Sequence, residues 1–342
     1  RPYLAAYRAA MTLTTAVAIL AVDFSAFPRR LAKTDSTRGV GLMDVGSGSF
    51  VLANALASRV ARGLTTSSPT LRSTRWWSLI FLACARGLAT HAMDYQQPVG
   101  EYGRHWNFFA TLAVVDLCAT ATPPPPAFSS FAGLAILVAH QTSLLRGASP
   151  SGAGAAGVAS SYGEYLLRDV PRGEGLLEQN KEGVGSIPGY VALYFLGAGL
   201  GRFVERSLCD AAKRASIRCW AWRWLLSLAV ADAAFWAAAM TLHARCQAVS
   251  RRTANAAYCA WMLAFNLQVL LAFIAAGLLF PATPPVPKLL AAVNRRLLPT
   301  FLVANLLTGA VNGAMDTIHV GTLTAWASMV GYLSVVCVVG LA

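Results

Sequence analysis

The chain has 342 residues, of which 56% are hydrophobic and 13% charged, with a formal net charge of +13. A soluble domain carries roughly 25% charged residues, so the composition excludes an ordinary soluble protein and indicates a polytopic membrane protein. A nucleic-acid partner is not expected, because a basic groove with stacking aromatic side chains would have to lie outside the bilayer.

Apolar stretches long enough to cross a bilayer, about 17–25 residues, recur along the chain with short connectors. They are continuous and lack the ten-residue alternation of barrel strands, so we predict an all-α transmembrane helical bundle forming a single domain over 1–342. About ten membrane helices are predicted, over residues 4–27, 39–60, 74–93, 104–122, 127–145, 186–205, 218–242, 254–280, 297–316 and 321–342.

The longest connector runs over residues 146–185. Its first part, 146–161, has low complexity and is predicted to be flexible. The part from Glu164 to Gly185 holds five of the fifteen acidic residues. That part is predicted to be either an ordered cap or a mobile lid.

Two GxxxG pairs lie inside apolar stretches, Gly197 with Gly201 and Gly309 with Gly313. Small residues at this spacing allow two helix backbones to approach closely. We therefore predict a close helix–helix contact at each pair.

A lone carboxylate, Asp23, stands near the end of the first apolar stretch, and Pro28, Arg29, Arg30 and Lys33 follow. An ionised Asp at a helix centre costs about 2.5–3.5 kcal/mol, and less near the boundary. Pro28 ends the helix, so the chain can fold back and bring Lys33 near the carboxylate. An acid held ionised in this way can accept a proton at neutral pH; a structural salt bridge at a helix end is the alternative.

A second carboxylate, Asp44, lies a few residues into the next apolar stretch. Burial of an unpaired carboxylate is costly. We expect Asp44 to pair with a cation or to cap a helix, and a direct part in substrate binding is the alternative.

Residues 101–109 place Glu, Arg, His and Asn at the mouth of a membrane stretch. Within them, His105 is a candidate base or proton shuttle, and a hydrogen-bonded structural role is the alternative.

Near the C-terminus, Asn305, Thr308, Asn312 and Asp316 share one face of a helix. A polar stripe inside an apolar helix either forms hydrogen bonds between helices or lines a site for a polar head group.

In order along the chain, these motifs resemble the inositol acyltransferases of glycosylphosphatidylinositol (GPI) anchor biosynthesis, the PIG-W family. Family members carry further membrane helices ahead of the Asp23 motif, so this chain is expected to lack N-terminal helices of a longer protein. The resemblance rests on residues 18–24, 27–34, 42–50, 101–109, 180–183, 188–190, 305–309 and 315–316.

The resemblance implies transfer of a long acyl chain, typically palmitoyl, from acyl-CoA to the inositol 2-hydroxyl of glucosaminyl-phosphatidylinositol. It places the enzyme in the endoplasmic reticulum membrane as a multi-pass protein. The acid and lysine of the family carry over to Asp23 and Lys33 as catalytic residues. Arg29 and Arg30 suit substrate phosphates, and the remaining substrate-binding candidates are Asp44, His105, Asn107, Asn312 and Asp316.

No metal or cofactor is expected, because a thioester is already activated and acyl-CoA is a cosubstrate. The expected partners are acyl-CoA, glucosaminyl-phosphatidylinositol and membrane lipids, and no protein partner is inferred. Two alternatives stay open: a membrane-bound O-acyltransferase of the His/Asn type with His105 as base, and a secondary transporter, which should show repeat symmetry around a midplane site.

Overall fold

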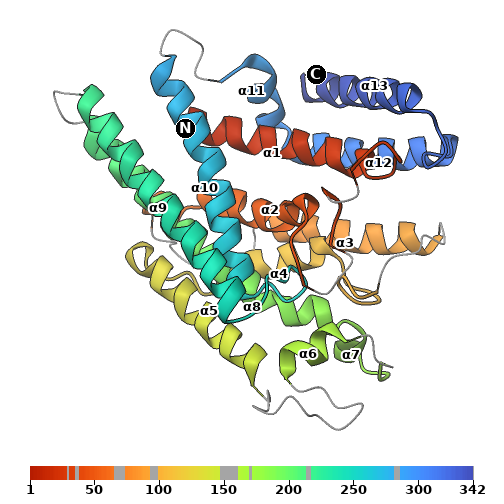
Figure 1. The fold of residues 1–342 in the computed structure, drawn as a ribbon, viewed down its shortest axis with the longest axis horizontal. Coiled ribbons are helices and arrows are strands. Elements are labelled where there is room, and N and C mark those ends of the chain that lie inside the picture. The colour runs from red at the N-terminus through yellow and green to blue at the C-terminus, as the bar shows by residue number, and fades with distance from the viewer. Residues whose placement is uncertain are drawn as a thin grey trace.

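The computed structural model describes residues 1–28, 31–34, 38–64, 74–92, 99–146, 161–168, 172–212, 217–280 and 286–341. The described residues form helices and connecting turns (Figure 1), without a strand among them. The helices are α1 (Pro2–Ala21), α2 (Val45–Leu56), α3 (Thr74–Ala92), α4 (Phe108–Ala121), α5 (Ser129–Leu145), α6 (Tyr162–Leu167), α7 (Leu176–Gln179), α8 (Lys181–Ala212), α9 (Ile217–Arg245), α10 (Ala256–Leu279), α11 (Lys288–Arg295), α12 (Leu297–Ala314) and α13 (Thr322–Leu341), with 3-10 turns at Leu42–Asp44 and Pro126–Phe128.

The membrane-crossing character predicted from the sequence is confirmed. Seven of the described helices are long and apolar enough to cross a bilayer, and three shorter apolar helices accompany them. Together they correspond in order to the ten predicted stretches. The short helices are α2, α3 and α4, and the all-α polytopic fold class therefore holds.

Helix α1 ends earlier than predicted, at Ala21 rather than near residue 27. Beyond it the backbone tightens into bonds to the third preceding residue, from Asp23 N to Leu20 O and from Phe24 N to Ala21 O. Pro28 would clash with the carbonyl of Phe24 if the helix continued, but the helix has already ended at Ala21. Asp23 consequently lies in the turn that follows the helix.

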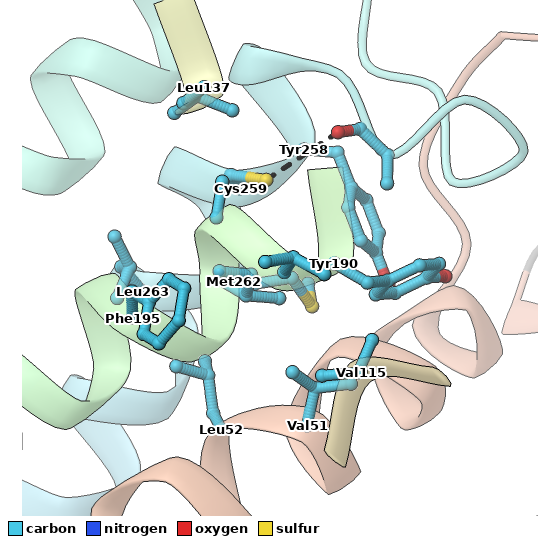
Figure 2. Close-up of a cluster of buried hydrophobic side chains, with 14 of the residues drawn as sticks. Val51, Leu52, Val115, Leu137, Tyr190, Phe195, Tyr258, Cys259, Met262 and Leu263 are labelled. Atoms are coloured by element: carbon cyan, nitrogen blue, oxygen red, sulfur yellow. Dashed lines mark hydrogen bonds between the residues drawn. The ribbon is translucent and has the colours of Figure 1, made fainter. Parts of the chain in front are cut away.

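Helix α8 runs through the middle of the main hydrophobic core. Tyr190 and Phe195 of this helix pack among apolar side chains from α2, α4, α5 and α10 (Figure 2). Cys259 of α10 adds a thiol donor to this core, which bonds the carbonyl oxygens of Gly189 and Ala254 at 3.5 Å. The core therefore ties α8 to four other helices.

One of the two predicted GxxxG contacts is confirmed. A side chain at Gly197 would collide with Leu52 of α2, and one at Gly201 would collide with Ala61, just beyond α2, and crowd Leu56. At Gly309 and Gly313 of α12 no atom of the described residues lies within 4 Å of the added carbon, so the predicted close contact is wrong for that pair. Spacing alone does not say whether a helix stands in front of the small residues.

Gly189→Ala is expected to destabilise the bundle by about 1–3 kcal/mol, the usual cost of overpacking a core. Its new methyl group would fall on the carbonyl oxygen of Ala254, a residue already held at a φ of 47°. Thermal unfolding in detergent measures the loss. Gly277→Ala on α10, where the added carbon has open space, is the matched control, and equal melting temperatures for the two variants would contradict the prediction.

Five connectors meet at one end of the bundle, which we call the polar end. Successive membrane-crossing helices alternate in direction, so the connectors after α1, α3, α5, α9 and α12 share that end, toward the right and lower right of Figure 1. Backbone bonds join two pairs of these connectors, from Gly39 N to Val249 O at 2.8 Å and from Arg104 N to Gln179 O at 3.0 Å. Motifs that are far apart in the sequence therefore meet at this end.

Candidate functional site

The first part of the site at the polar end is formed by α1 and α12, which pack against each other. Asn312 donates from Nδ2 to Asp23 Oδ2 at 2.8 Å. Asp23 is half-buried in its turn, and Asn312 is exposed near the end of α12. This bond orients the Asp23 carboxylate, which is not fully buried.

The predicted polar face of α12 is only partly used between helices. Asn312 reaches Asp23, and Thr308 Oγ1 lies 3.4 Å from the hydroxyl of Tyr332 on α13. Asn305, in contrast, donates to Phe301 O within its own helix. The stripe therefore contributes one contact to the site and one to helix packing.

Asp316 follows α12 by two residues and pairs with His319. Its Oδ2 lies 2.7 Å from His319 Nδ1, and its Oδ1 accepts from Ile318 N at 3.3 Å. The hydrogen bond from His319 lowers the pKa of this carboxyl below its ordinary value. Asp316 is 66% exposed, so at neutral pH it presents an ionised, accessible acid at the polar end.

Lys33 does not form the predicted pair with Asp23. Its Nζ lies 3.3 Å from Glu101, a residue of the connector between α3 and α4. A backbone bond from Leu31 N to Pro28 O at 2.9 Å follows the end of α1. What the sequence does not show is that a carboxylate from another connector meets the returning ammonium.

Lys33 belongs to a group that we call the Arg251 cluster, formed by Lys33, Asp44, Glu101, Tyr102 and Arg251, in which Arg251 and Asp44 are buried. Arg251 is 7% exposed and bonds Asp44 Oδ1 through Nε at 2.8 Å. Its Nη1 donates to the Tyr102 hydroxyl at 3.1 Å, and its Nη2 lies 3.4 Å from Glu101. Burial alone would lower the pKa of Arg251, but Tyr102, Glu101 and Asp44 together raise it by more, so its pKa lies above the ordinary value. Arg251 is therefore a permanent buried cation.

Asp44 is fully occupied by structural contacts. Its Oδ1 bonds Arg251, and its Oδ2 accepts from Thr34 N, Thr34 Oγ1 and Gly41 N at 2.8–3.0 Å. Both structural expectations from the sequence hold, since Asp44 pairs with a cation and caps the turn that starts at Gly41. Its geometry fits a positioning residue rather than a direct substrate ligand.

His105 and Asn107, which the sequence groups together, have different environments. His105 is exposed, with Nε2 at 3.0 Å from Gln179 Oε1. Asn107 is buried and caps α4, accepting from Ala110 N and donating to Ala83 O. His105 therefore stays available to a ligand, whereas the side chain of Asn107 is committed to the fold.

Asn107→Ala is expected to lower the free energy of unfolding by about 1 kcal/mol through loss of the helix cap, and the carbonyl oxygen of Ala83 on α3 loses the bond from Asn107 Nδ2 as well. Thermal unfolding in detergent measures the change. Asn107→Asp keeps the accepting oxygen and should retain more stability than the alanine variant. If both variants melt together, the cap contributes nothing.

Asn180 and Gly183 hold the connector after α5 against the connector after α3. Asn180 Oδ1 accepts from His105 N and Trp106 N at 2.8 and 3.0 Å. A side chain at Gly183 would collide with Trp106. These residues carry the sequence motif at 180–183, and their role in the structure is to seat residues 101–107 at the polar end.

The described part of the long connector is folded. Residues 161–168 and 172–180 contain α6 and α7, and Lys181 Nζ donates to Tyr165 O and Arg168 O at 2.7 Å. Arg172 and the buried Glu182 form a second ion pair at 2.7 Å. Most of the stretch predicted to be flexible, 147–160, lies outside the described residues, as do Arg29 and Arg30.

Sequence reasoning missed Glu101, Tyr102 and Arg251 as site residues. Glu101 and Tyr102 lie in the motif at 101–109, in which His105 was the residue assigned a candidate role. Arg251 lies beside Arg252 in a connector, where pairs of arginines are typical of membrane flanks. A signal was present only in Asp44, whose burial required a cation of unknown position.

A bundle of apolar helices with ionisable side chains collected at one end defines a polytopic membrane protein with a polar site at the ends of its helices. More specifically, the chain belongs to the GWT1 family, whose model matches residues 1–342.

Relatives are found in plants, fungi and animals. An uncharacterized protein of Arabidopsis thaliana is 37% identical over 97% of this chain and 71% of its own length. GPI-anchored wall transfer protein 1 of Aspergillus fumigatus is 35% identical over 100% of this chain and 72% of its own length. The mouse glucosaminyl-phosphatidylinositol-acyltransferase PIGW is 30% identical over 99% of this chain and 72% of its own length.

Proposed function

We propose that this protein is an inositol acyltransferase of GPI-anchor biosynthesis. Its acceptor is glucosaminyl-phosphatidylinositol, and the observation that carries the proposal is the similarity, over nearly the whole chain, to a mouse protein named for that acyl transfer. The gathering of ionisable side chains at one end of a membrane bundle supports it. The donor is a long-chain acyl-CoA such as palmitoyl-CoA, and the reaction takes place in the endoplasmic reticulum membrane.

Asp23 is the proposed general base. Its carboxylate accepts the proton of the inositol 2-hydroxyl while the hydroxyl oxygen attacks the thioester carbonyl carbon. The tetrahedral oxyanion then collapses, the carbon–sulfur bond breaks, and the proton passes to the departing CoA thiolate. A positioned base contributes about 10²–10⁴-fold to such a step, and the bond from Asn312 orients the carboxylate for it.

Lys33 is the proposed stabiliser of the thioester oxyanion. Its ammonium is bonded to Glu101 and 48% exposed, so it keeps donors free for an incoming oxygen. A donor with a positive charge stabilises the negative charge that develops on the thioester oxygen as the hydroxyl attacks. The alternative role, holding Asp23 ionised, has less support because Lys33 pairs with Glu101. The thioester is already activated, so the proposal includes no cofactor.

Substrate binding is assigned by accessibility. His105 and Asp316 are exposed at the polar end and suit the hydroxyls of the sugar and inositol, and Asn312 can add a bond beside Asp23. Arg29 and Arg30 remain proposed phosphate ligands. Asp44 and Asn107 are proposed to act indirectly, by holding the connectors that carry the other residues.

The proposal is tested with the purified protein in phospholipid vesicles, radiolabelled palmitoyl-CoA and glucosaminyl-phosphatidylinositol. The expected product is a labelled lipid that resists a phospholipase C requiring a free inositol 2-hydroxyl. A labelled product that this phospholipase still cleaves would mean that the acyl group is attached at a position other than the inositol 2-hydroxyl. Absence of any transfer by folded protein would reject the enzyme and favour the transporter.

The rival His/Asn-type mechanism makes a distinct prediction. If Asp23 is the base, His105→Ala loses a binding contact and its kcat should fall by less than about tenfold, well below the 10²–10⁴-fold effect of a base. Initial rates at saturating acyl-CoA measure it. If kcat falls by three orders of magnitude in His105→Ala while Asp23→Asn stays active, His105 and not Asp23 is the base.

A further inference from the structure

We propose that Arg251 is a positioning residue for acyl transfer, which acts on Lys33 through Glu101 and Asp44 without touching substrate. The inference rests on the proposed role of Lys33 in the reaction. It assigns a function to the buried centre of the Arg251 cluster, which lies more than two hundred positions from Lys33 in the chain.

The first route runs through side chains. Glu101 lies between two cations, with Lys33 Nζ at 3.3 Å and Arg251 Nη2 at 3.4 Å. Exposure rises from 7% at Arg251 to 17% at Glu101 and 48% at Lys33. The three groups therefore form a line from the interior to the surface, and Arg251 anchors the carboxylate that holds the ammonium.

The second route runs through the backbone. Asp44 Oδ2 accepts from both the backbone N and the hydroxyl of Thr34, the residue next to Lys33. Asp44 Oδ1 is in turn bonded to Arg251 Nε at 2.8 Å. Arg251 thus fixes the main chain at Lys33 as well as the tip of its side chain.

The geometry requires an arginine. Three nitrogens of Arg251 reach three separate acceptors, Nε to Asp44, Nη1 to the Tyr102 hydroxyl and Nη2 to Glu101. The guanidinium also lies over the Tyr102 ring, 5.5 Å from its centroid. A lysine ammonium is a compact point charge and does not reproduce this planar fork. Arg251→Lys therefore keeps the charge and removes the positioning.

Steady-state kinetics give the first test. Arg251→Lys should lower kcat by about 10–100-fold, as expected when a transition-state contact is misplaced, and leave KM for acyl-CoA within about twofold. In a Lys33→Ala background, which keeps Asp23 and a residual rate, the same substitution should cost nothing further, because residues that act as a unit are not additive. Equal losses in both backgrounds would overturn the proposal.

Chemical labelling gives a second test that does not depend on acyl transfer. The chain has only four lysines, Lys33, Lys181, Lys213 and Lys288, so mass spectrometry can follow the reaction of Lys33 with an amine-reactive ester. Arg251→Lys and Glu101→Gln should each speed labelling of Lys33 several-fold relative to Lys288. The matched control is Arg172→Lys, which alters another buried Arg–Glu pair and should leave Lys33 unchanged.

The two tests separate this inference from the proposed function. Unchanged labelling of Lys33 in folded Arg251→Lys protein overturns the positioning role, whatever the kinetics show. Faster labelling supports it, together with a kcat loss that Arg251→Lys causes in protein that keeps Lys33 but not in the Lys33→Ala background. If Lys33→Ala itself transfers acyl groups at the wild-type rate, the catalytic role of Lys33 fails, and with it the link between Arg251 and catalysis.

Discussion

Asp23→Asn is expected to lower kcat for acyl transfer by about 10²–10⁴-fold, the range for removal of a general base. The substitution is nearly isosteric, and its amide oxygen can still accept the hydrogen bond that Asn312 donates to Asp23 at 2.8 Å. What the variant loses is the capacity to take the inositol proton. Because Asp23 lies in a turn outside α1, folding should be preserved, and thermal unfolding checks this.

Asn312→Ala is the control for that experiment. It removes the donor that orients the carboxylate but leaves the base in place. We expect kcat to fall by about tenfold or less, in keeping with the roughly 0.5–1.5 kcal/mol of one hydrogen bond. A folded Asp23→Asn protein with near wild-type activity would reject Asp23 as the base, and a deeper loss in Asn312→Ala than in Asp23→Asn would place the chemistry on α12.

Asp44→Ala is expected to cost about 3–5 kcal/mol of stability, as when one partner of a buried ion pair is removed. Asp44 is 2% exposed, and its loss leaves Arg251 without its shortest contact. The donors of Thr34 and Gly41 lose their acceptor at the same time. Urea or thermal unfolding in detergent should show this as the largest stability change among the acidic residues discussed.

Asp316→Ala is the matched control, because Asp316 is an exposed acid at the same end of the bundle. A surface ion pair contributes little to folding, so the Asp316→Ala protein should unfold close to the wild-type midpoint. Equal unfolding of the two variants would mean that the Asp44 contacts exchange with water. Asp44→Asn should lie between them, since it keeps an acceptor but loses the charge.

The sequence was sufficient for the bundle because hydropathy and proline positions act locally. All ten apolar stretches correspond to helices, and the errors lie at their ends, as where α1 stops at Ala21. The sequence also predicted correctly that Asp44 needs a cation, because the cost of burying a carboxylate does not depend on which cation offsets it.

The partners of Lys33 and Asp44 in their ion pairs could not be predicted from the sequence, because they depend on which connectors lie side by side in the folded bundle. Lys33 has Asp23 ten residues away in the chain, yet it pairs with Glu101, 68 residues away. Asp44 pairs with Arg251 at a separation of 207. Helix periodicity carries no information on which connector lies beside which, so the ion pairs of the polar end follow only from the packed bundle.

The long separations at the polar end also set the order in which the site can be built during synthesis. Membrane helices leave the ribosome from the N-terminus, and Asp23 meets Asn312 across 289 residues of chain. The Arg251 cluster can close once α10 begins, whereas the Asp23 carboxylate stays without its Asn312 bond until α12 has entered the bilayer. A nascent chain stopped before α12 therefore carries the proposed base but not the residue that orients it.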